Sequence, residues 1–188
     1  MTESDVLKWI KNNLSSYIKD AIKDSIYPES LIAGITCRET GGLISKYAFS
    51  PAGNTVNYLN VCALLRGDYS QRHGETEKKY HGYGLTQIDT GSFPDFIKSG
   101  WWEDPSKVYP LTIKILNGKR DYILSHAPDN LIKDVQGNLL HYVVAAYNCG
   151  EGNEMKVINQ HLDPDAYTTQ HNYSKDVFRL SEIYQNLV

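Results

Sequence analysis

The residues whose types and spacing could do chemistry are carboxylates, beginning with Glu39. It closes the apolar part of the segment PESLIAGITCRETGG, in which Ile32, Ile35 and Glu39 follow one another at steps of three and four. At helical spacing these side chains share one face, so Glu39 is predicted to lie on the core-facing stripe of a helix. Partial burial disfavours the charged form and raises the pKa of a carboxyl, which suits a general acid. The alternative is a solvated glutamate in the last turn of the helix, with no function.

A second carboxylate is needed for some reactions, and Asp89 is the first candidate. It lies in the glycine-flanked stretch TQIDTG, although aspartate before Thr-Gly is also an ordinary turn former. Glu75 and Glu77, in HGETEKK, are further candidates, and a solvated charge cluster is the competing interpretation for both. The sequence therefore offers three possible partners for Glu39.

Metal, cofactor and thiol chemistry find no support in the sequence. Cys37, Cys62 and Cys149 are odd in number and show no C-x-x-C spacing, so we expect neither a zinc site nor a complete disulfide framework. The histidines are dispersed, and neither Cys37 nor Cys149 comes with a recognisable base. We expect no metal and no cofactor.

Composition and charge narrow the class of partner. The 188 residues are most simply one soluble domain, and a net charge of −3 with scattered Lys and Arg argues against nucleic acid. The 14 tyrosines combine apolar area with a hydroxyl, which suits grooves for sugars or peptides. The N-terminal stretch MTESDVLKWIKNNL has no continuous apolar run, so we expect no signal peptide, and we expect no membrane span elsewhere. We expect a monomer.

The elements that must position these residues are predicted to be mostly helices. An apolar stripe over residues 4–26, with Ser4 as its N-cap, predicts a first helix. Pro28 begins a second helix, which Gly41 and Gly42 are expected to end. Further helices are predicted at about 56–65, 106–125, 139–148 and 172–187, and a hairpin or irregular loop at 83–94. The expected fold class is mainly α with few, short strands.

Four blocks of sequence occur in a fixed order: LIAGITCRETGG, GYGLTQID, AAYNCGEGN and HNYSKDVF. Together they resemble goose-type lysozymes and the catalytic domains of soluble lytic transglycosylases, which act on peptidoglycan. Each block alone is short, and the ordered set is far more specific. The resemblance covers roughly Asp20 to Tyr184. It implies a lysozyme-like, mainly helical α+β fold of two lobes, with a small hairpin or irregular β region and a central cleft.

The resemblance also implies a role for each matching residue. Glu39 is the catalytic acid, and Asp89 is the carboxylate that helps to hold the attacking water. The residues implied to bind the saccharide are Tyr83, Gln87, Ile88, Tyr147, Asn148 and Tyr173. The expected partner is bacterial peptidoglycan or a chitooligosaccharide. The expected reaction is hydrolysis of the β-1,4 bond between N-acetylmuramic acid and N-acetylglucosamine in the cell wall.

The chain departs from that family between Glu39 and Gly82, where it is considerably longer. We therefore expect one catalytic domain over residues 1–188 with an insertion at about 45–81. The second acid that goose-type enzymes carry shortly before the G-[YFW]-G block has no aligned counterpart, and Lys78 falls near its place. A lytic transglycosylase, which forms 1,6-anhydromuramic products, is the alternative. A non-catalytic peptidoglycan-binding module is a further one.

Overall fold

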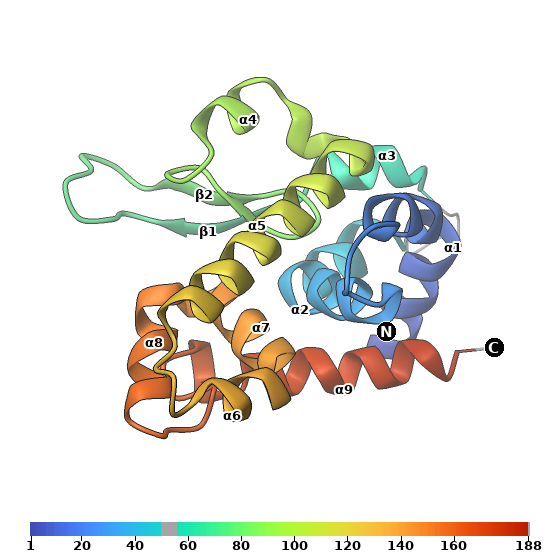
Figure 1. Ribbon diagram of the computed structural model, residues 1–188. Coiled ribbons are helices and arrows are strands. Elements are labelled where there is room, and N and C mark those ends of the chain that lie inside the picture. Colours follow the sequence, from blue (N-terminus) through green and yellow to red (C-terminus); the bar gives the residue numbers. More distant parts are fainter. Residues whose placement is uncertain (50–55, 188) are drawn as a thin grey trace. The chain divides into compact units, whose positions relative to one another are not determined.

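The computed structural model describes residues 1–49 and 56–187, which are mainly helical and include one small antiparallel sheet (Figure 1). The chain divides into two compact units. Unit 1 comprises Met1–Thr112 with Leu180–Val188, and unit 2 comprises Ile113–Arg179. The boundaries fall inside two helices, α5 (Pro105–His126) and α9 (Tyr173–Gln185). The mainly helical class predicted from the periodicity is confirmed.

Unit 1 is built on α1 (Glu3–Ile22) and α2 (Glu29–Tyr47), which pack against each other (Figure 1). The buried stripe of α1 recurs every three or four residues through Leu7, Ile10, Leu14 and Ile18. The first helix begins after Thr2, whose hydroxyl accepts the backbone N–H of Asp5 while the Asp5 carboxylate accepts the N–H of Thr2. This capping box replaces the predicted N-cap Ser4.

The second helix does not end at Gly41–Gly42, so the predicted glycine stop is wrong. It continues to Tyr47, and Ile44 beyond the glycines is fully buried. A glycine inside a helix costs about 0.5–1 kcal/mol relative to alanine, whereas burying an isoleucine contributes about 1.5–3 kcal/mol. Tertiary burial thus outweighs the local signal. As a result, Glu39 lies in the interior of α2 and not in its last turn.

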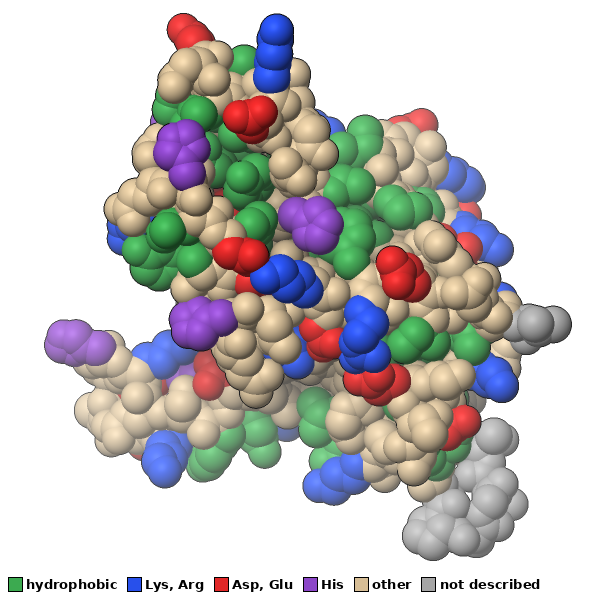
Figure 2. Space-filling view, turned by 90° about the horizontal axis from the view of Figure 1, so that it is seen from below, with side chains coloured by type: hydrophobic (Ala, Val, Ile, Leu, Met, Phe, Trp, Pro, Cys, Tyr) green, Lys and Arg blue, Asp and Glu red, His purple; other side chains and the backbone are tan. Residues whose placement is uncertain are grey.

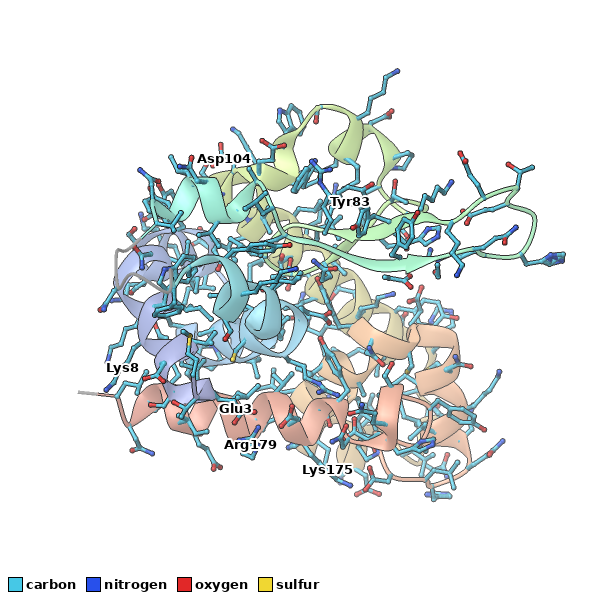
Figure 3. The ribbon with its side chains drawn as sticks, turned by 180° about the vertical axis from the view of Figure 1, so that it is seen from behind. Glu3, Lys8, Tyr83, Asp104, Lys175 and Arg179 are labelled. Carbon is cyan, nitrogen blue, oxygen red and sulfur yellow. The ribbon has the colours of Figure 1, made fainter. Side chains whose placement is uncertain are left out.

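The region between the first helices and residue 90 contains a short helix and the sheet. Its elements are α3 (Tyr58–Cys62), β1 (Arg66–Ser70), β2 (Lys79–Tyr83) and β3 (Ile88–Asp89). The strand order is β1-β2-β3, with both pairs antiparallel and Tyr69 opposite Tyr80. The β1–β2 hairpin projects beyond the helices of its own unit (Figures 1 and 3). Pairing of β2 with β3 confirms the hairpin alternative for 83–94, whereas β1 and most of β2 lie where the sequence predicted no strand.

The rest of unit 1 consists of two short helices and parts of two long ones. These are α4 (Pro94–Lys98), the 3-10 helix η1 (Trp101–Glu103), the first part of α5 and the last part of α9, from Leu180. In this unit η1 contacts both α3 and α4, and its Trp102 is buried. The predicted helix at 106–125 is confirmed by α5, which continues through Pro110 and Gly118.

Unit 2 is helical throughout its regular elements. They are the remainder of α5, α6 (Ile132–Gly137), α7 (Leu139–Cys149), α8 (Glu151–Asn159), η2 (Thr169–His171) and the first part of α9. The segment Val143–Ala146 of α7 is fully buried, and α7 contacts both α6 and α8 (Figure 1). Gly150, with φ of 84°, separates α7 from α8. Gly152 lies inside α8, a helix that the sequence did not predict.

The surface charges, the lengths of the apolar helices and the state of the cysteines also bear on function. Within the described residues, no helix is both long and apolar enough to cross a membrane. On the face that Figure 2 draws, Lys and Arg side chains are interspersed with Asp and Glu, which gives no argument for a nucleic-acid partner. All three cysteines are free thiols, and Cys37 and Cys62 are buried.

Candidate functional site

Glu39 lies at the margin between the core and the surface of unit 1. The preceding segment Leu31–Cys37 is buried, as is Thr40, while the Glu39 side chain is partly exposed. This is the position that its spacing from Ile32 and Ile35 predicts. Because Glu39 is in the interior of α2, the partial charges at the helix termini act on it weakly.

Thr40, the neighbour of Glu39, ties α2 to the turn between β2 and β3. Its hydroxyl lies 2.8 Å from the Thr36 carbonyl oxygen and 3.0 Å from the Leu85 carbonyl oxygen. All three residues are buried, where an unpaired polar group costs about 1–3 kcal/mol. The hydrogen bonds therefore hold the segment that carries Glu39 against the block 82–89.

The turn between β2 and β3 is held by contacts on several sides. Gly84 has φ of 76°, and a Cβ there would lie 2.6 Å from the Trp102 carbonyl oxygen. The hydroxyls of Thr86 and Thr112, both buried, are 2.8 Å apart. The N–H of Gln87 donates to the Gly84 carbonyl at 3.1 Å and closes the turn. Packing therefore accounts for the glycine and the threonine of this block without a ligand.

Gln87 is held in an unusual backbone conformation. Its φ is 53°, and its side-chain Nε2 donates to the Gly84 carbonyl at 3.0 Å. The side chain lies over the β1–β2 pair, where a Cβ at Gly67 or Gly82 would be 2.2 or 2.5 Å from Gln87 Oε1. Left-handed backbone at a non-glycine residue costs about 1–3 kcal/mol and is concentrated at functional sites. Gln87 is partly exposed as a residue, and these contacts fix its amide.

Tyr83 and Ile88 differ in how much surface they offer. The Tyr83 ring packs edge-on against Trp102, with 5.2 Å between ring centroids, and stays partly exposed. Ile88 is 1% exposed. Of the residues expected to bind a saccharide in this unit, Tyr83 and Gln87 can therefore contact a ligand directly, whereas Ile88 supports them from the core.

Asp89 is a partly exposed carboxylate held at both oxygens. Oδ1 accepts the N–H of Ser92 at 2.9 Å and its hydroxyl at 3.1 Å, and Oδ2 accepts from Arg72 Nη1 at 2.5 Å. Burial acts to raise the pKa of Asp89, but Arg72 and Ser92 outweigh it and hold the pKa below its usual range. A carboxylate has about four acceptor positions. With three filled, one is left for a further donor such as water.

Glu75, the alternative second carboxylate, closes the loop of the hairpin. It accepts the backbone N–H of Arg72 at 2.8 Å and pairs with Lys79 and His81, each at 3.1 Å. The Arg72 N–H is the main cause of a lowered pKa of Glu75; burial opposes this shift, and Lys79 adds to it. These contacts give Glu75 a structural role within the hairpin. The third candidate, Glu77, is exposed.

In unit 2, Tyr147 and Asn148 occupy the C-terminal end of α7, and both are partly exposed. Asn148 Oδ1 accepts the backbone N–H of Thr169 at 2.8 Å, which ties α7 to η2. Tyr173, at the start of α9, is 2% exposed, and its N–H donates to the Thr168 hydroxyl at 3.3 Å. Tyr173 therefore has little surface to offer a ligand, unlike Tyr147 and Asn148.

Glu154 is a buried acid of unit 2 that the sequence analysis did not single out. It is 0% exposed, its Oε2 accepts from the Cys149 thiol at 3.5 Å, and its Oε1 has no partner among the described residues. Burial raises the pKa of Glu154 to about 8; the Cys149 thiol opposes this, and the charges of Asp165 and Asp163 add to it. Glu154 is therefore mostly neutral at pH 7. The signal that could have found it is the buried helical spacing of Glu154, Met155, Val157 and Ile158.

Arg72 is the second residue that the sequence analysis missed. Its guanidinium joins Asp89 to Asp68, whose Oδ2 lies 2.8 Å from Arg72 Nη2. No periodic pattern marks a residue in a hairpin loop, so the sequence carries no comparable signal for it.

Within the described part of the chain, no cluster of three or more His, Cys, Asp or Glu side chains could hold a metal ion. No family model, curated protein or solved structure matches the chain.

Proposed function

We propose that the chain is a muramidase, which hydrolyses the β-1,4 bond between N-acetylmuramic acid and N-acetylglucosamine in peptidoglycan. The observation that carries the proposal is the hydrogen bond from Thr40 to Leu85, which joins the segment of Glu39 to the block 82–89. Two stretches that are distant in sequence are thereby neighbours in unit 1. One carries the carboxyl group of Glu39, and the other carries an aromatic ring, an amide and a second carboxylate. Glycosidases use a pair of carboxyl groups, and the ring and the amide are groups that can contact a sugar.

In the proposed reaction Glu39 donates its proton to the leaving glycosidic oxygen. Hydrolysis with inversion also requires a base that activates a water on the opposite face of the sugar ring, about 6.5–9.5 Å from the acid. Asp89 is assigned this role, because its one unfilled acceptor position suits a single water. Its lowered pKa keeps it ionised and able to accept a proton.

The sugar is assigned to the exposed polar and aromatic side chains of the four blocks. Tyr83 and Gln87 offer a ring and a fixed amide. Tyr147 and Asn148 are assigned by the resemblance, and their partial exposure leaves surface for a ligand. Buried Ile88 and Tyr173 are assigned a supporting role instead of direct contact.

One observation favours the lytic transglycosylase as a second candidate. The contacts of Asp89 with Arg72 and Ser92 that keep it ionised also make it a weaker base. A transglycosylase needs no second carboxylate, because the C6 hydroxyl of the muramic acid attacks its own C1 while Glu39 acts as acid and then as base. The product then carries a 1,6-anhydro end.

Mass spectrometry of muropeptides released from purified peptidoglycan separates these reactions. Hydrolysis gives hydrated reducing ends, whereas transglycosylation gives anhydro ends that are lighter by one water. Reducing ends support the proposal, and anhydro ends alone contradict it in favour of the second candidate. Binding of peptidoglycan without any released fragment supports the non-catalytic module and refutes both reactions.

Substitution of the three candidate carboxylates tests the identity of the base. Asp89→Asn is expected to lower kcat for hydrolysis by about 100- to 10,000-fold, the usual contribution of a general base. Glu182→Gln, on an exposed glutamate of α9, serves as the matched control and is expected to keep full activity. If Glu75→Gln or Glu77→Gln causes the larger loss, the assignment of Asp89 is wrong.

A further inference from the structure

We propose that Arg72, in the loop between β1 and β2, is a positioning residue that orients Asp89 and keeps it ionised for the reaction. This inference rests on the proposed function. Arg72 lies in the region that we expect to be an insertion relative to the resembled family, and the inference assigns that region a role in the site.

The contacts of Arg72 form a bridge between the hairpin and β3. Nη1 donates to Asp89 Oδ2 at 2.5 Å, although the two residues are 17 positions apart, and Nη2 donates to Asp68 Oδ2 at 2.8 Å. The backbone N–H of Arg72 donates to Glu75 Oε2 at 2.8 Å. A guanidinium presents its donors in a fixed plane, so it can hold two carboxylates in one geometry, which a lysine cannot do.

The loop that carries Arg72 is itself tied to the strands. Glu75 pairs with His81, whose side chain is 1% exposed on β2, and with Lys79. The His81 Nε2 also lies 3.1 Å from the Ser70 carbonyl oxygen on β1. Glu75 therefore ties the loop to β2, and His81 in turn ties β2 to β1, so the loop that carries Arg72 is held against the hairpin.

The two oxygens of Asp89 are held by different partners. Ser92 binds Oδ1 and Arg72 binds Oδ2, so rotation of the carboxylate would break hydrogen bonds at one oxygen or the other. The remaining acceptor position is therefore fixed in direction, as a base that activates one water requires. Loss of Arg72 frees Oδ2 and removes the positive charge that favours the ionised form.

A purely stabilising role does not account for this pair. The side chains of Arg72 and Asp89 are 43% and 35% exposed, and ion pairs of such exposure contribute about 0–1 kcal/mol to folding. The same positive charge acts directly on the protonation of Asp89. Its removal is therefore expected to affect the pH dependence of the reaction more than the stability of the fold.

The experiment compares the pH profile of kcat/KM on peptidoglycan for the wild type, Arg72→Met and Arg72→Lys. In Arg72→Met the acid limb is expected to move to higher pH, with activity at the acid end of the profile at least tenfold below wild type. Arg72→Lys keeps the charge and is expected to retain the limb but to lower kcat, because the fork geometry is lost. Arg120→Met is the matched control, since Arg120 pairs with its sequence neighbour Asp121 on α5.

Two further variants separate the local contact from the hairpin as a whole. Asp68→Asn removes the other partner of Arg72 and is expected to leave the acid limb in place. Combining Arg72→Met with Asp89→Asn is expected to cause no loss beyond that of Asp89→Asn alone. Arg72→Gln provides a second neutral substitution if Arg72→Met does not fold.

The possible failures are distinguishable. If Arg72→Met and Arg72→Gln keep the wild-type acid limb while Asp89→Asn is inactive, the inference is overturned and the proposed function stands. If Asp89→Asn is as active as the wild type, the role of Asp89 fails and the inference fails with it. A shifted limb that also appears in Arg120→Met would mean that the effect is not specific to Arg72, and it overturns the inference.

Discussion

Replacing Glu154 by glutamine is expected to abolish a large pH dependence of stability. The folded chain holds Glu154 protonated up to a pKa of about 8, whereas an ordinary glutamate ionises with a pKa of 4.5. Between these values folding takes up a proton, so the free energy of unfolding falls as the pH rises. Above about pH 8 the folded form ionises as well and the dependence levels off. Glu154→Gln has no proton to lose, so this component disappears.

The size of the effect follows from the two pKa values. At about 1.36 kcal/mol for each pKa unit, raising the pH from 5 to 7.5 lowers the contribution of Glu154 by on the order of 3 kcal/mol. For a chain of this length that corresponds to roughly 6–12 °C in Tm. The amide of glutamine adds buried N–H donors that cost about 1–3 kcal/mol if unpaired. This cost does not depend on pH. The quantity to compare is therefore the change in the free energy of unfolding between pH 5 and pH 7.5, from which the cost cancels.

The assay is urea unfolding followed by far-UV circular dichroism at several pH values. All three tryptophans, Trp9, Trp101 and Trp102, belong to unit 1, so their fluorescence reports separately on the unit that lacks Glu154. Glu182→Gln, on an exposed residue of α9, is the control. If Glu154→Gln and wild type lose stability equally between pH 5 and 7.5, Glu154 is not held neutral by burial and the reasoning is refuted.

Two further predictions concern stability. Gly84→Ala is expected to lower the free energy of unfolding, measured in urea, by more than about 2 kcal/mol. Left-handed backbone costs about 1–3 kcal/mol, and the new Cβ would lie 2.6 Å from the Trp102 carbonyl oxygen. A loss below about 0.5 kcal/mol would contradict this packing. Asp165→Ala is expected to cost about 2–4 kcal/mol by circular dichroism, because the buried Asp165 carboxylate accepts the N–H groups of Ser174 and Lys175 at the start of α9. Wild-type stability of this variant would show that the capping contacts do not matter.

Helical periodicity correctly predicted the helix that carries Glu39 and the face on which Glu39 lies. The local stop signal, a pair of glycines, predicted the wrong end for that helix. The spacing of Ile32, Ile35 and Glu39 placed the glutamate on a mostly buried face, as the structure has it. The glycine pair after it was expected to end the helix, but the burial of Ile44 extends α2 to Tyr47. Propensity is a weak prior that tertiary contacts override.

The hairpin could not be predicted for a physical reason. Strands with one buried face alternate in polarity, but β1 and β2 carry burial patterns without alternation, because the hairpin projects beyond the helices of its unit (Figure 1). The pairing of Arg72 with Asp89 depends on that hairpin and crosses 17 positions of sequence. Spacing rules describe neighbours on one helix or strand, and a contact of this kind lies outside them.

The most direct test of the central claim is the activity of Glu39→Gln on purified peptidoglycan. Glutamine keeps the shape of the side chain and removes the proton donor, so kcat is expected to fall by about 100- to 10,000-fold while the Kd for a chitooligosaccharide stays at the wild-type value. Glu182→Gln, the exposed control, is expected to retain full activity. If Glu39→Gln releases muropeptides at the wild-type rate, Glu39 is not the general acid and the proposed mechanism is contradicted.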